Sequence, residues 1–243
     1  MLKTITAESK PGPFLNVNED AQDFDTYKKI YMVLDGFGGS GIGDKAVTDL
    51  KQQIKAEYGA SQKDLDKTLS FFYSPRYLLE ANILLNLLHK YNYELWLQNQ
   101  NLSITQRAGA AGIFMVESEK VLSLCSIGNC RSFLIRDGAI FPLSLSDSTA
   151  MFSSVGHSSK GQLPLSGIGL FKHPNFQVTE VSLKNDDIII ALTDGAFSHL
   201  QDEEIKSLVL NYRKSAKQRV VDLFTLANKR GNLDNQTILL LEY

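Results

Sequence analysis

The residues with the clearest potential for chemistry are five acidic side chains in four separated segments. They are Glu19 and Asp20 in Asn-Glu-Asp-Ala, Asp35 in Leu-Asp-Gly-Phe-Gly-Gly, Asp194 in Leu-Thr-Asp-Gly-Ala, and Asp234 in Leu-Asp-Asn-Gln-Thr. Two of the segments end an apolar run typical of a buried strand, and a third precedes such a run. Because a carboxylate is costly to desolvate without a cation, this pattern indicates a site for hard metal ions with oxygen ligands.

The strands and helices predicted around these acids follow an α+β pattern. Apolar runs predict strands at 30–34, 110–117, 120–127, 131–135, 139–141, 177–183, 188–193 and 236–242. Helical spacing predicts helices at 44–58, at 78–95 with Pro75 in the first turn, at 202–212, and at 215–230 with Gly231 as cap. Loops are expected at 10–18, 36–43, 59–67 and 144–171. Successive hairpins in the middle of the chain favour antiparallel sheets covered by helices.

Length and composition limit the class of protein. A chain of 243 residues, 43% apolar and 21% charged, can bury its core as one domain, which we expect over residues 1–243. The net charge of −2 argues against nucleic acid as a partner, and no apolar run is long enough to span a membrane. The N-terminus lacks a secretory signal, and two cysteines are too few for a disulfide framework. We expect a cytoplasmic monomer, with secretion as an effector left open.

The order of the acidic motifs resembles that of the PP2C (PPM) family, the metal-dependent serine/threonine protein phosphatases, in its bacterial form. The likeness runs almost end to end, through Asn18-Glu19-Asp20-Ala21, Asp35-Gly36-Phe37-Gly38-Gly39, Cys125 to Arg131, Thr193-Asp194-Gly195 and Asp234-Asn235-Gln236-Thr237. Each motif alone is weak, because Asp-Gly is also a common turn. The resemblance implies a four-layer α-β-β-α sandwich, in which helix pairs flank two antiparallel sheets.

The resemblance also implies an activity, the hydrolysis of phosphoserine and phosphothreonine in the protein targets of serine/threonine kinases. It implies two bound Mn²⁺ or Mg²⁺ ions, held by Glu19, Asp20, Asp35, Gly36, Asp194 and Asp234. Asp35, Asp194 and Asp234 would form the catalytic core, with Asp35 bridging the two ions. Two divalent ions neutralise a phosphomonoester dianion and activate a water or hydroxide between them, so no protein nucleophile is needed.

Three positions depart from the family pattern. Leu15 stands where many members carry an arginine that binds the substrate phosphate, and a neutral side chain makes no bidentate contact of that kind. Asn129 replaces an aspartate linked to a third metal ion, so we expect that ion to bind weakly. We expect Asn129 and Asn235 either to bind this third ion weakly or to hold neighbouring metal ligands in place. Phe37 replaces a histidine of the animal members, and residues 144–171 correspond to a variable loop that we expect to contact substrate.

Two alternatives remain open at this point. Cys130 and Arg136 have the Cys-x5-Arg spacing of cysteine-dependent phosphatases, but the residues between them predict a strand rather than a loop that cradles phosphate. The chain could instead be a weak or inactive PP2C-like binding or regulatory domain, which Leu15 and Asn129 favour. The retained carboxylates argue against that domain, because clustered acids without a metal repel one another. His157 is expected to have no role in the site.

Overall fold

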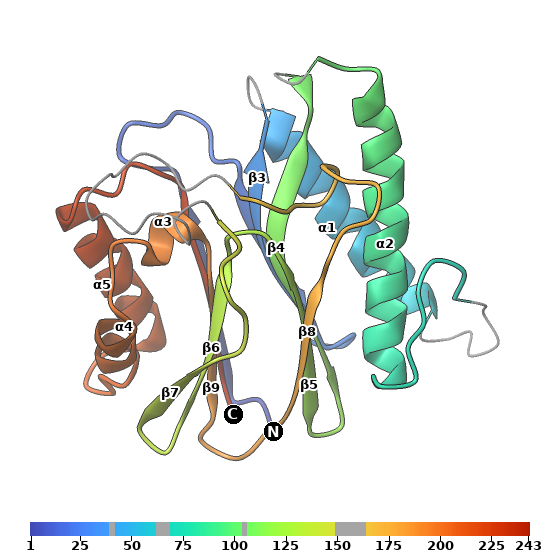
Figure 1. The fold of residues 1–243 in the computed structure, drawn as a ribbon. Coiled ribbons are helices and arrows are strands. Elements are labelled where there is room, and N and C mark those ends of the chain that lie inside the picture. Colours follow the sequence, from blue (N-terminus) through green and yellow to red (C-terminus); the bar gives the residue numbers. More distant parts are fainter. Residues whose placement is uncertain (39–41, 62–68, 104–105, 149–163) are drawn as a thin grey trace.

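The computed structural model describes residues 1–38, 42–61, 69–103, 106–148 and 164–243. Within these residues the strands form two antiparallel sheets that stack face to face (Figure 1). Sheet A has the order β1 (Thr4–Lys10), β10 (Gln236–Glu242), β9 (Ile188–Leu192), β6 (Arg131–Arg136) and β7 (Ala139–Pro142). Sheet B has the order β2 (Asp20–Asp25), β3 (Ile30–Phe37), β4 (Gly109–Ser118), β5 (Val121–Ile127) and β8 (Gln177–Ser182).

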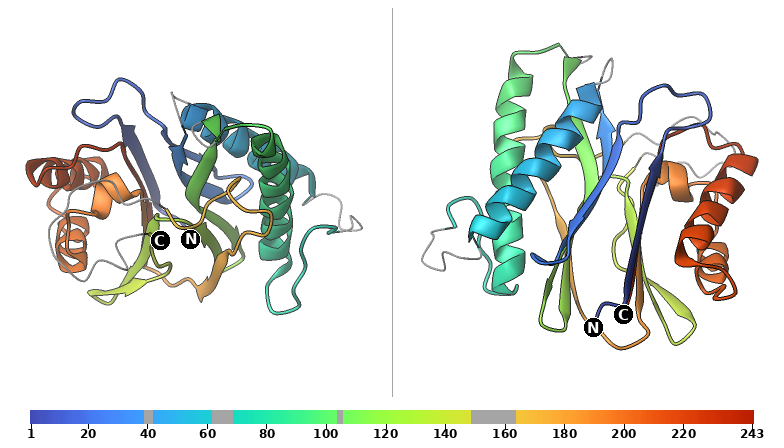
Figure 2. Two further views of the ribbon diagram at one scale, coloured as in Figure 1. Left: turned by 45° about the horizontal axis from the view of Figure 1, so that its top comes forward. Right: turned by 180° about the vertical axis from the view of Figure 1, so that it is seen from behind.

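Helices cover the outer face of each sheet, as both views in Figure 2 show. The helices α1 (Ile42–Ser61) and α2 (Leu79–Gln100) pack on sheet B, whereas α3 (Asp194–Phe197), α4 (Asp202–Val209) and α5 (Ala216–Lys229) pack on sheet A. The predicted α+β class and four-layer arrangement are therefore confirmed. Among the described helices, none has both the length and the apolar character that crossing a bilayer requires.

The central strands are buried on both faces, which explains their continuous apolar sequences. In β3, Ile30, Met32 and Leu34 pack toward the helices, while Tyr31 and Val33 pack between the two sheets. Successive side chains of a strand point to opposite faces, so a strand covered on both sides needs apolar residues at every position.

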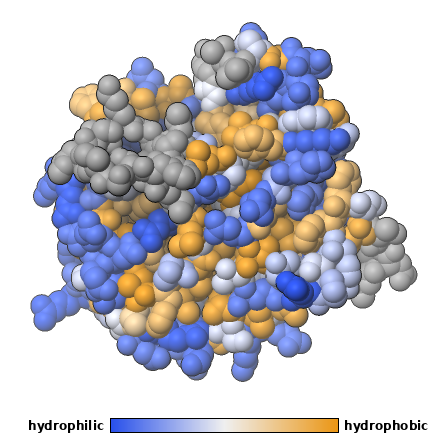
Figure 3. All heavy atoms as spheres, in the orientation of Figure 1, coloured by the Kyte–Doolittle hydropathy of each residue, from blue (hydrophilic) through white to orange (hydrophobic). Residues whose placement is uncertain are grey.

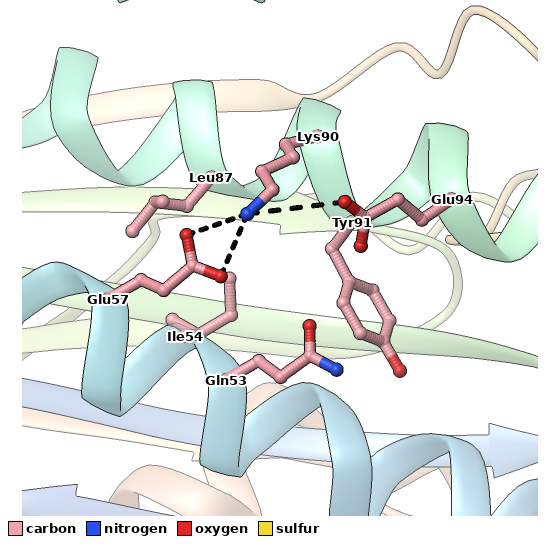
Figure 4. Close-up of a pocket in the computed structure, with 7 residues that line it drawn as sticks. All are labelled: Gln53, Ile54, Glu57, Leu87, Lys90, Tyr91 and Glu94. Carbon is pink, nitrogen blue, oxygen red and sulfur yellow. Dashed lines mark hydrogen bonds and ion pairs between the residues drawn. The ribbon is translucent and has the colours of Figure 1, made fainter.

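A small ionic contact ties α1 to α2 along their seam (Figure 4). Lys90 of α2 donates to both carboxylate oxygens of Glu57 in α1 at 2.9 Å, and lies 4.0 Å from Glu94. The hollow beside this contact, lined also by Gln53 and Tyr91, has a volume of about 10 Å³. A space of that size holds at most one water molecule, so the contact joins the helices rather than forming a ligand site.

The structure corrects several boundaries that the sequence predicted. β1 and β2 were not expected, because edge strands are partly exposed and their sequences are largely polar. β3 does not end before Asp35 but continues to Phe37, paired with β4. α3, which starts at Asp194, was also not predicted.

The start of α2 differs from the prediction that placed Pro75 in its first turn. α2 begins at Leu79, because the side-chain amide of Asn82 donates to the carbonyls of Ser74, Tyr77 and Leu78 and holds this segment as a turn. At the other end of the chain the predicted cap is confirmed, since Gly231 follows α5 with a φ of 96°. Gly39, His157 and most of the predicted loop 144–171 lie outside the described residues.

Candidate metal centre

Sheet B brings three of the predicted acids to one end of the sandwich. Asp20 and Asp35 are register partners across β2 and β3. The backbone N–H of Gly36 donates to the carbonyl of Glu19 at 3.1 Å, and a Cβ on Gly36 would lie 2.6 Å from that oxygen. The Glu19 side chain accepts from the N–H of Gly43, at the start of α1, at 3.2 Å. Glycine at position 36 therefore allows the close approach of β2, β3 and α1.

Sheet A supplies the other two acids, at the ends of neighbouring strands. Asp194 begins α3, directly after β9, and Asp234 precedes β10. Gly195 packs so tightly on the second segment that a Cβ there would lie 2.0 Å from the Asn235 carbonyl oxygen and 3.1 Å from the Cβ of Asp234. No larger residue fits at position 195 while this contact is kept.

Three polar side chains join the acidic segments across the sheets. The Thr193 hydroxyl of sheet A donates to Asp20 of sheet B at 2.7 Å. Asn129, between β5 and β6, donates through Nδ2 to Asp194 at 2.8 Å and to Asp35 at 3.2 Å. The side-chain oxygen of Asn235 accepts from the backbone N–H of Glu19 at 3.0 Å. Together these contacts assemble residues that lie far apart in the sequence.

Four carboxyl groups of the cluster, those of Glu19, Asp20, Asp35 and Asp194, have raised pKa values. Burial is the largest cause of the shift in all four groups. It raises the pKa of Asp20 to about 8 and the pKa of Asp194 to about 6, and it also raises the pKa values of Glu19 and Asp35. Neighbouring carboxylates raise these pKa values further: Asp194 is the leading one for Asp20 and Asp35, and Asp234 for Glu19 and Asp194. In the described part of the chain, no lysine or arginine is among the groups that shift them. The cluster thus has negative charge without a cationic partner.

The chemistry of the donor set fits a hard divalent cation. All of the acidic ligands offer oxygen, which Mg²⁺ and Mn²⁺ prefer, and their raised pKa values indicate charge that a bound cation would offset. Among the described residues, no three or more His, Cys, Asp or Glu side chains are grouped in an arrangement that could itself hold a metal ion. The amide of Asn129 lies between Asp35 and Asp194 as a donor to both.

Sequence reasoning named Asn129 and Asn235 as possible supports of the acids, but it missed the supporting roles of Thr193 and of the Gly43 N–H. The hydroxyl of Thr193 belongs to the Thr-Asp-Gly motif, and that motif is a signal that could have identified it. The N–H of Gly43 and the bridging contacts of Asn129 depend on the packing of distant segments, so no local signal predicts them.

The residues of the alternative cysteine site do not form a phosphate-binding loop. Cys130 is buried and its pKa is raised well above the ordinary value, chiefly by burial. The guanidinium of Arg136 makes two contacts of 2.7 and 2.6 Å to Asp187, at the other end of the strand. Asp187, directly before β9, is buried and paired with Arg136.

Comparison with solved structures identifies the fold, whereas no protein-family model and no curated protein matches the sequence. The serine/threonine phosphatase of S. agalactiae superposes with a TM-score of 0.78 and 19% identity, over 98% of both chains. The PPM Ser-Thr phosphatase MsPP from Mycobacterium smegmatis, solved in complex with cacodylate, gives a TM-score of 0.77 and 19% identity, over 99% of this chain and 98% of that one.

A further similar structure is PppA, described as a key regulatory component of the T6SS in Pseudomonas aeruginosa. It has a TM-score of 0.77 and 18% identity, over 98% of this chain and 96% of its own. Likeness at these identities establishes the fold and leaves the chemistry of the site to its own residues. Over nearly its whole length, the chain has the fold of the bacterial PPM (PP2C) serine/threonine phosphatases.

Proposed function

We propose that the chain is a metal-dependent phosphatase that hydrolyses phosphoserine and phosphothreonine in proteins. The observation that carries the proposal is the meeting of Asp20, Asp35 and Asp194 from both sheets, where no lysine or arginine of the described residues shifts their pKa values. The PPM fold supports it, because the similar structures include proteins described as serine/threonine phosphatases.

The acids are proposed to hold two Mn²⁺ or Mg²⁺ ions. Asp35 lies opposite Asp20 in the strand register and is hydrogen-bonded with Asp194. This central position suits Asp35 to bind both ions. Asp194 and Asp234 are assigned to one ion and Glu19 to the other. Bound ions of this kind neutralise phosphate charge and lower the pKa of a water ligand.

Two further ligand assignments complete the proposed set. Asp20 is assigned a contact through water, because its side chain already accepts from the Thr193 hydroxyl. The carbonyl of Gly36 is assigned to one of the ions. Both assignments follow the positions that these residues occupy in the family motifs.

The remaining residues are proposed to hold these ligands in place before substrate arrives. Thr193 fixes the orientation of Asp20, the Gly43 N–H fixes that of Glu19, and Asn235 anchors the backbone of Glu19. Asn129 fixes Asp35 and Asp194 relative to each other. Supports of this kind keep ligand geometry constant, and their loss commonly weakens metal affinity or activity.

The test is hydrolysis of p-nitrophenyl phosphate and of a phosphothreonine peptide, measured in Mn²⁺, in Mg²⁺ and in EDTA. We expect turnover that requires a divalent ion and stops in EDTA, together with a rise in the melting temperature on addition of the ion. Circular dichroism in each buffer controls for folding. Absence of turnover by folded protein at all ion concentrations would contradict the proposal.

One observation favours a second candidate, a PP2C-like binding or regulatory domain with weak or no turnover. The Asn129 amide donates to two of the proposed metal ligands, where a further carboxylate would add negative charge. For such a domain, we expect a phosphothreonine peptide to bind in Mn²⁺ without being hydrolysed. Calorimetry and phosphate release, measured on the same sample, distinguish the two candidates.

A further inference from the structure

The loop of residues 11–18, between β1 and β2, exposes hydrophobic side chains beside the acidic cluster. Phe14 is 82% exposed, Leu15 43% and Val17 48%. Leu233, in the turn before β10, is 56% exposed. We call these four side chains the apolar rim. Figure 3 shows hydrophobic residues at the upper left of this face, where Figure 1 places the loop.

Backbone packing seats the loop on the turn that carries Asp234. A Cβ on Gly12 would lie 2.3 Å from the carbonyl oxygen of Leu233 and 2.7 Å from that of Asp234, so the two backbones are in direct contact. Pro11 and Pro13 flank this glycine and fix their own φ angles. The loop therefore has little conformational entropy to lose when a ligand binds.

Hydrogen bonds connect the loop to the metal ligands. The backbone N–H of Leu15 donates to the Gly12 carbonyl at 3.1 Å and closes a turn around Phe14. The Val17 carbonyl accepts from the Asn235 amide at 3.2 Å, and the same amide group accepts from the N–H of Glu19. The Asn235 side chain thus connects Val17 of the apolar rim to Glu19, a proposed metal ligand.

The apolar rim carries almost no charge. Residues 11–18 and 231–235 contain no lysine or arginine, and Asp234 is the sole ionisable side chain among them. The cations next along the chain are engaged elsewhere: Lys10 lies over the Phe224 ring at 5.7 Å, and Arg230 donates to Glu204 at 2.6 Å. Exposed apolar area whose own residues include no cation favours contact with apolar groups.

We propose that the apolar rim selects phosphoprotein segments that have apolar side chains next to the phosphorylated residue. This inference rests on the proposed function, because a phosphothreonine that reaches the cluster carries its flanking residues with it. The connection of the rim to Asp234 and Glu19 puts those flanking residues within its reach. The rim contacts the substrate outside the phosphoryl group, so it acts on KM rather than on kcat.

The experiment compares two phosphothreonine peptides of equal length and charge. One has Leu and Phe beside the phosphothreonine, and the other has Gln and Ser at the same positions. We expect the wild-type protein to favour the apolar peptide about tenfold in kcat/KM, the effect of burying one or two apolar side chains. The double variant Phe14→Ser/Leu233→Ser is expected to reduce that ratio to about twofold or less.

The matched control is Phe141→Ser, at a side chain that is 48% exposed on the edge strand β7 of sheet A. This variant is expected to keep the tenfold preference. Because each preference is a ratio measured on one preparation, the fraction of active protein cancels. Equal kcat/KM for the two peptides in the wild type would overturn the inference, and so would a tenfold ratio that survives in the double variant.

Turnover of p-nitrophenyl phosphate separates this inference from the function on which it rests. If neither this compound nor the peptides are hydrolysed, the proposed function fails. The same peptides are then labelled with a fluorophore, and their binding to the protein in Mn²⁺ is measured by fluorescence anisotropy. A tenfold difference in Kd that the double variant removes supports the apolar rim, whereas equal Kd values overturn it. Sedimentation that shows a dimer lost in the double variant would assign the rim to a second copy of the chain instead.

Discussion

Strand β9 carries a buried aspartate just beyond each of its ends, and the two have opposite electrostatics. Asp187, before the strand, is 1% exposed, and Asp194, after it, is 7% exposed. Burial tends to raise both pKa values, but hydrogen bonds from Arg136 and from the Lys184 N–H, with the Arg136 charge, lower that of Asp187 below its ordinary value. Asp194 has acids and an amide around it instead, and its pKa rises to about 6.

The difference between the two aspartates separates a structural acid from a candidate ligand. Both aspartates are buried beside the same strand, but their pKa values shift in opposite directions because one end provides a guanidinium and the other provides more carboxylates. The end with Asp187 is already neutralised within the protein. The end with Asp194 gains stability when an external cation binds, which is the property expected of a metal site.

The largest effect is expected from Asp194→Asn, with Asp35→Asn as its companion. Each substitution removes a proposed metal ligand, so we expect phosphatase activity in Mn²⁺ to fall by more than about a hundredfold. The melting temperature in EDTA should not fall, because the change removes a charge from a repelling cluster. Full activity in either variant would contradict the two-metal proposal.

Asp187→Asn should show the reverse pattern. It leaves Arg136 without its charged partner, so we expect a loss of about 2 kcal/mol in the free energy of unfolding, while activity of the folded protein is retained. Urea denaturation and peptide kinetics measure the two quantities. A stable but inactive Asp187→Asn variant would contradict the assignment of Asp187 to stability and of Asp194 to metal binding.

The pH dependence of stability should depend on the metal. Carboxyls whose folded-state pKa is raised bind more protons in the folded state than in the unfolded state, so stability falls as pH rises from the unfolded pKa through the folded pKa. In EDTA, the melting temperature should therefore fall from pH near 3.8, the ordinary value, to about 8, the raised pKa of Asp20. Saturating Mn²⁺ should reduce this fall. Identical profiles in EDTA and in Mn²⁺ would argue against a cation at the cluster.

Asn129→Asp should strengthen the contrast by adding a carboxylate between Asp35 and Asp194. The variant loses the Nδ2 donor to both acids and gains a negative charge, so we expect lower stability in EDTA. The Mn²⁺ concentration that gives half-maximal activity should drop about tenfold, for roughly 1.4 kcal/mol of added attraction. An unchanged Mn²⁺ requirement would mean that position 129 has no influence on the ions.

Leu15→Arg provides the smallest expected effect and gives the acidic end a cation of its own. A guanidinium near the cluster offers bidentate contact to a phosphate, so we expect KM for the phosphothreonine peptide to fall a few-fold. Leu15→Met serves as the control for side-chain length without charge. An unchanged or higher KM in Leu15→Arg would contradict the role assigned to the missing arginine.

The parts of the fold that the sequence predicted are those with a strong local signal. The run Ile30–Leu34 is apolar at every position because both faces of β3 are covered, so its strand is plain from the sequence. β2 was missed because Asp20–Asp25 is an edge strand with mostly polar residues, whose extended form depends on pairing with β3. Pro75 misled the prediction because Asn82 reorganises the backbone before α2.

The acids of the candidate site were predictable, and Asn129 and Asn235 could be named as possible supports, but the contacts that these supports make could not be predicted. Asp35 and Asp194 each belong to an Asp-Gly motif beside an apolar run, whereas Asn129 meets them across separations of 94 and 65 residues. Contacts over such distances depend on how the two sheets stack. No periodicity or motif within a single segment encodes that stacking.

The hydroxyl of Thr193 has a consequence for how the two sheets separate. It links sheet A to sheet B at the acidic end, while Tyr243 links them at the opposite end by donating to Glu117 at 3.3 Å. Hydrogen bonds to acids therefore join the two sheets at both ends, and of these two acids only Asp20, at the Thr193 end, belongs to the proposed ion-binding cluster. Chelation of the ions should open the sandwich from that end, so backbone amides near Asp20 should exchange with solvent earlier than those near Glu117.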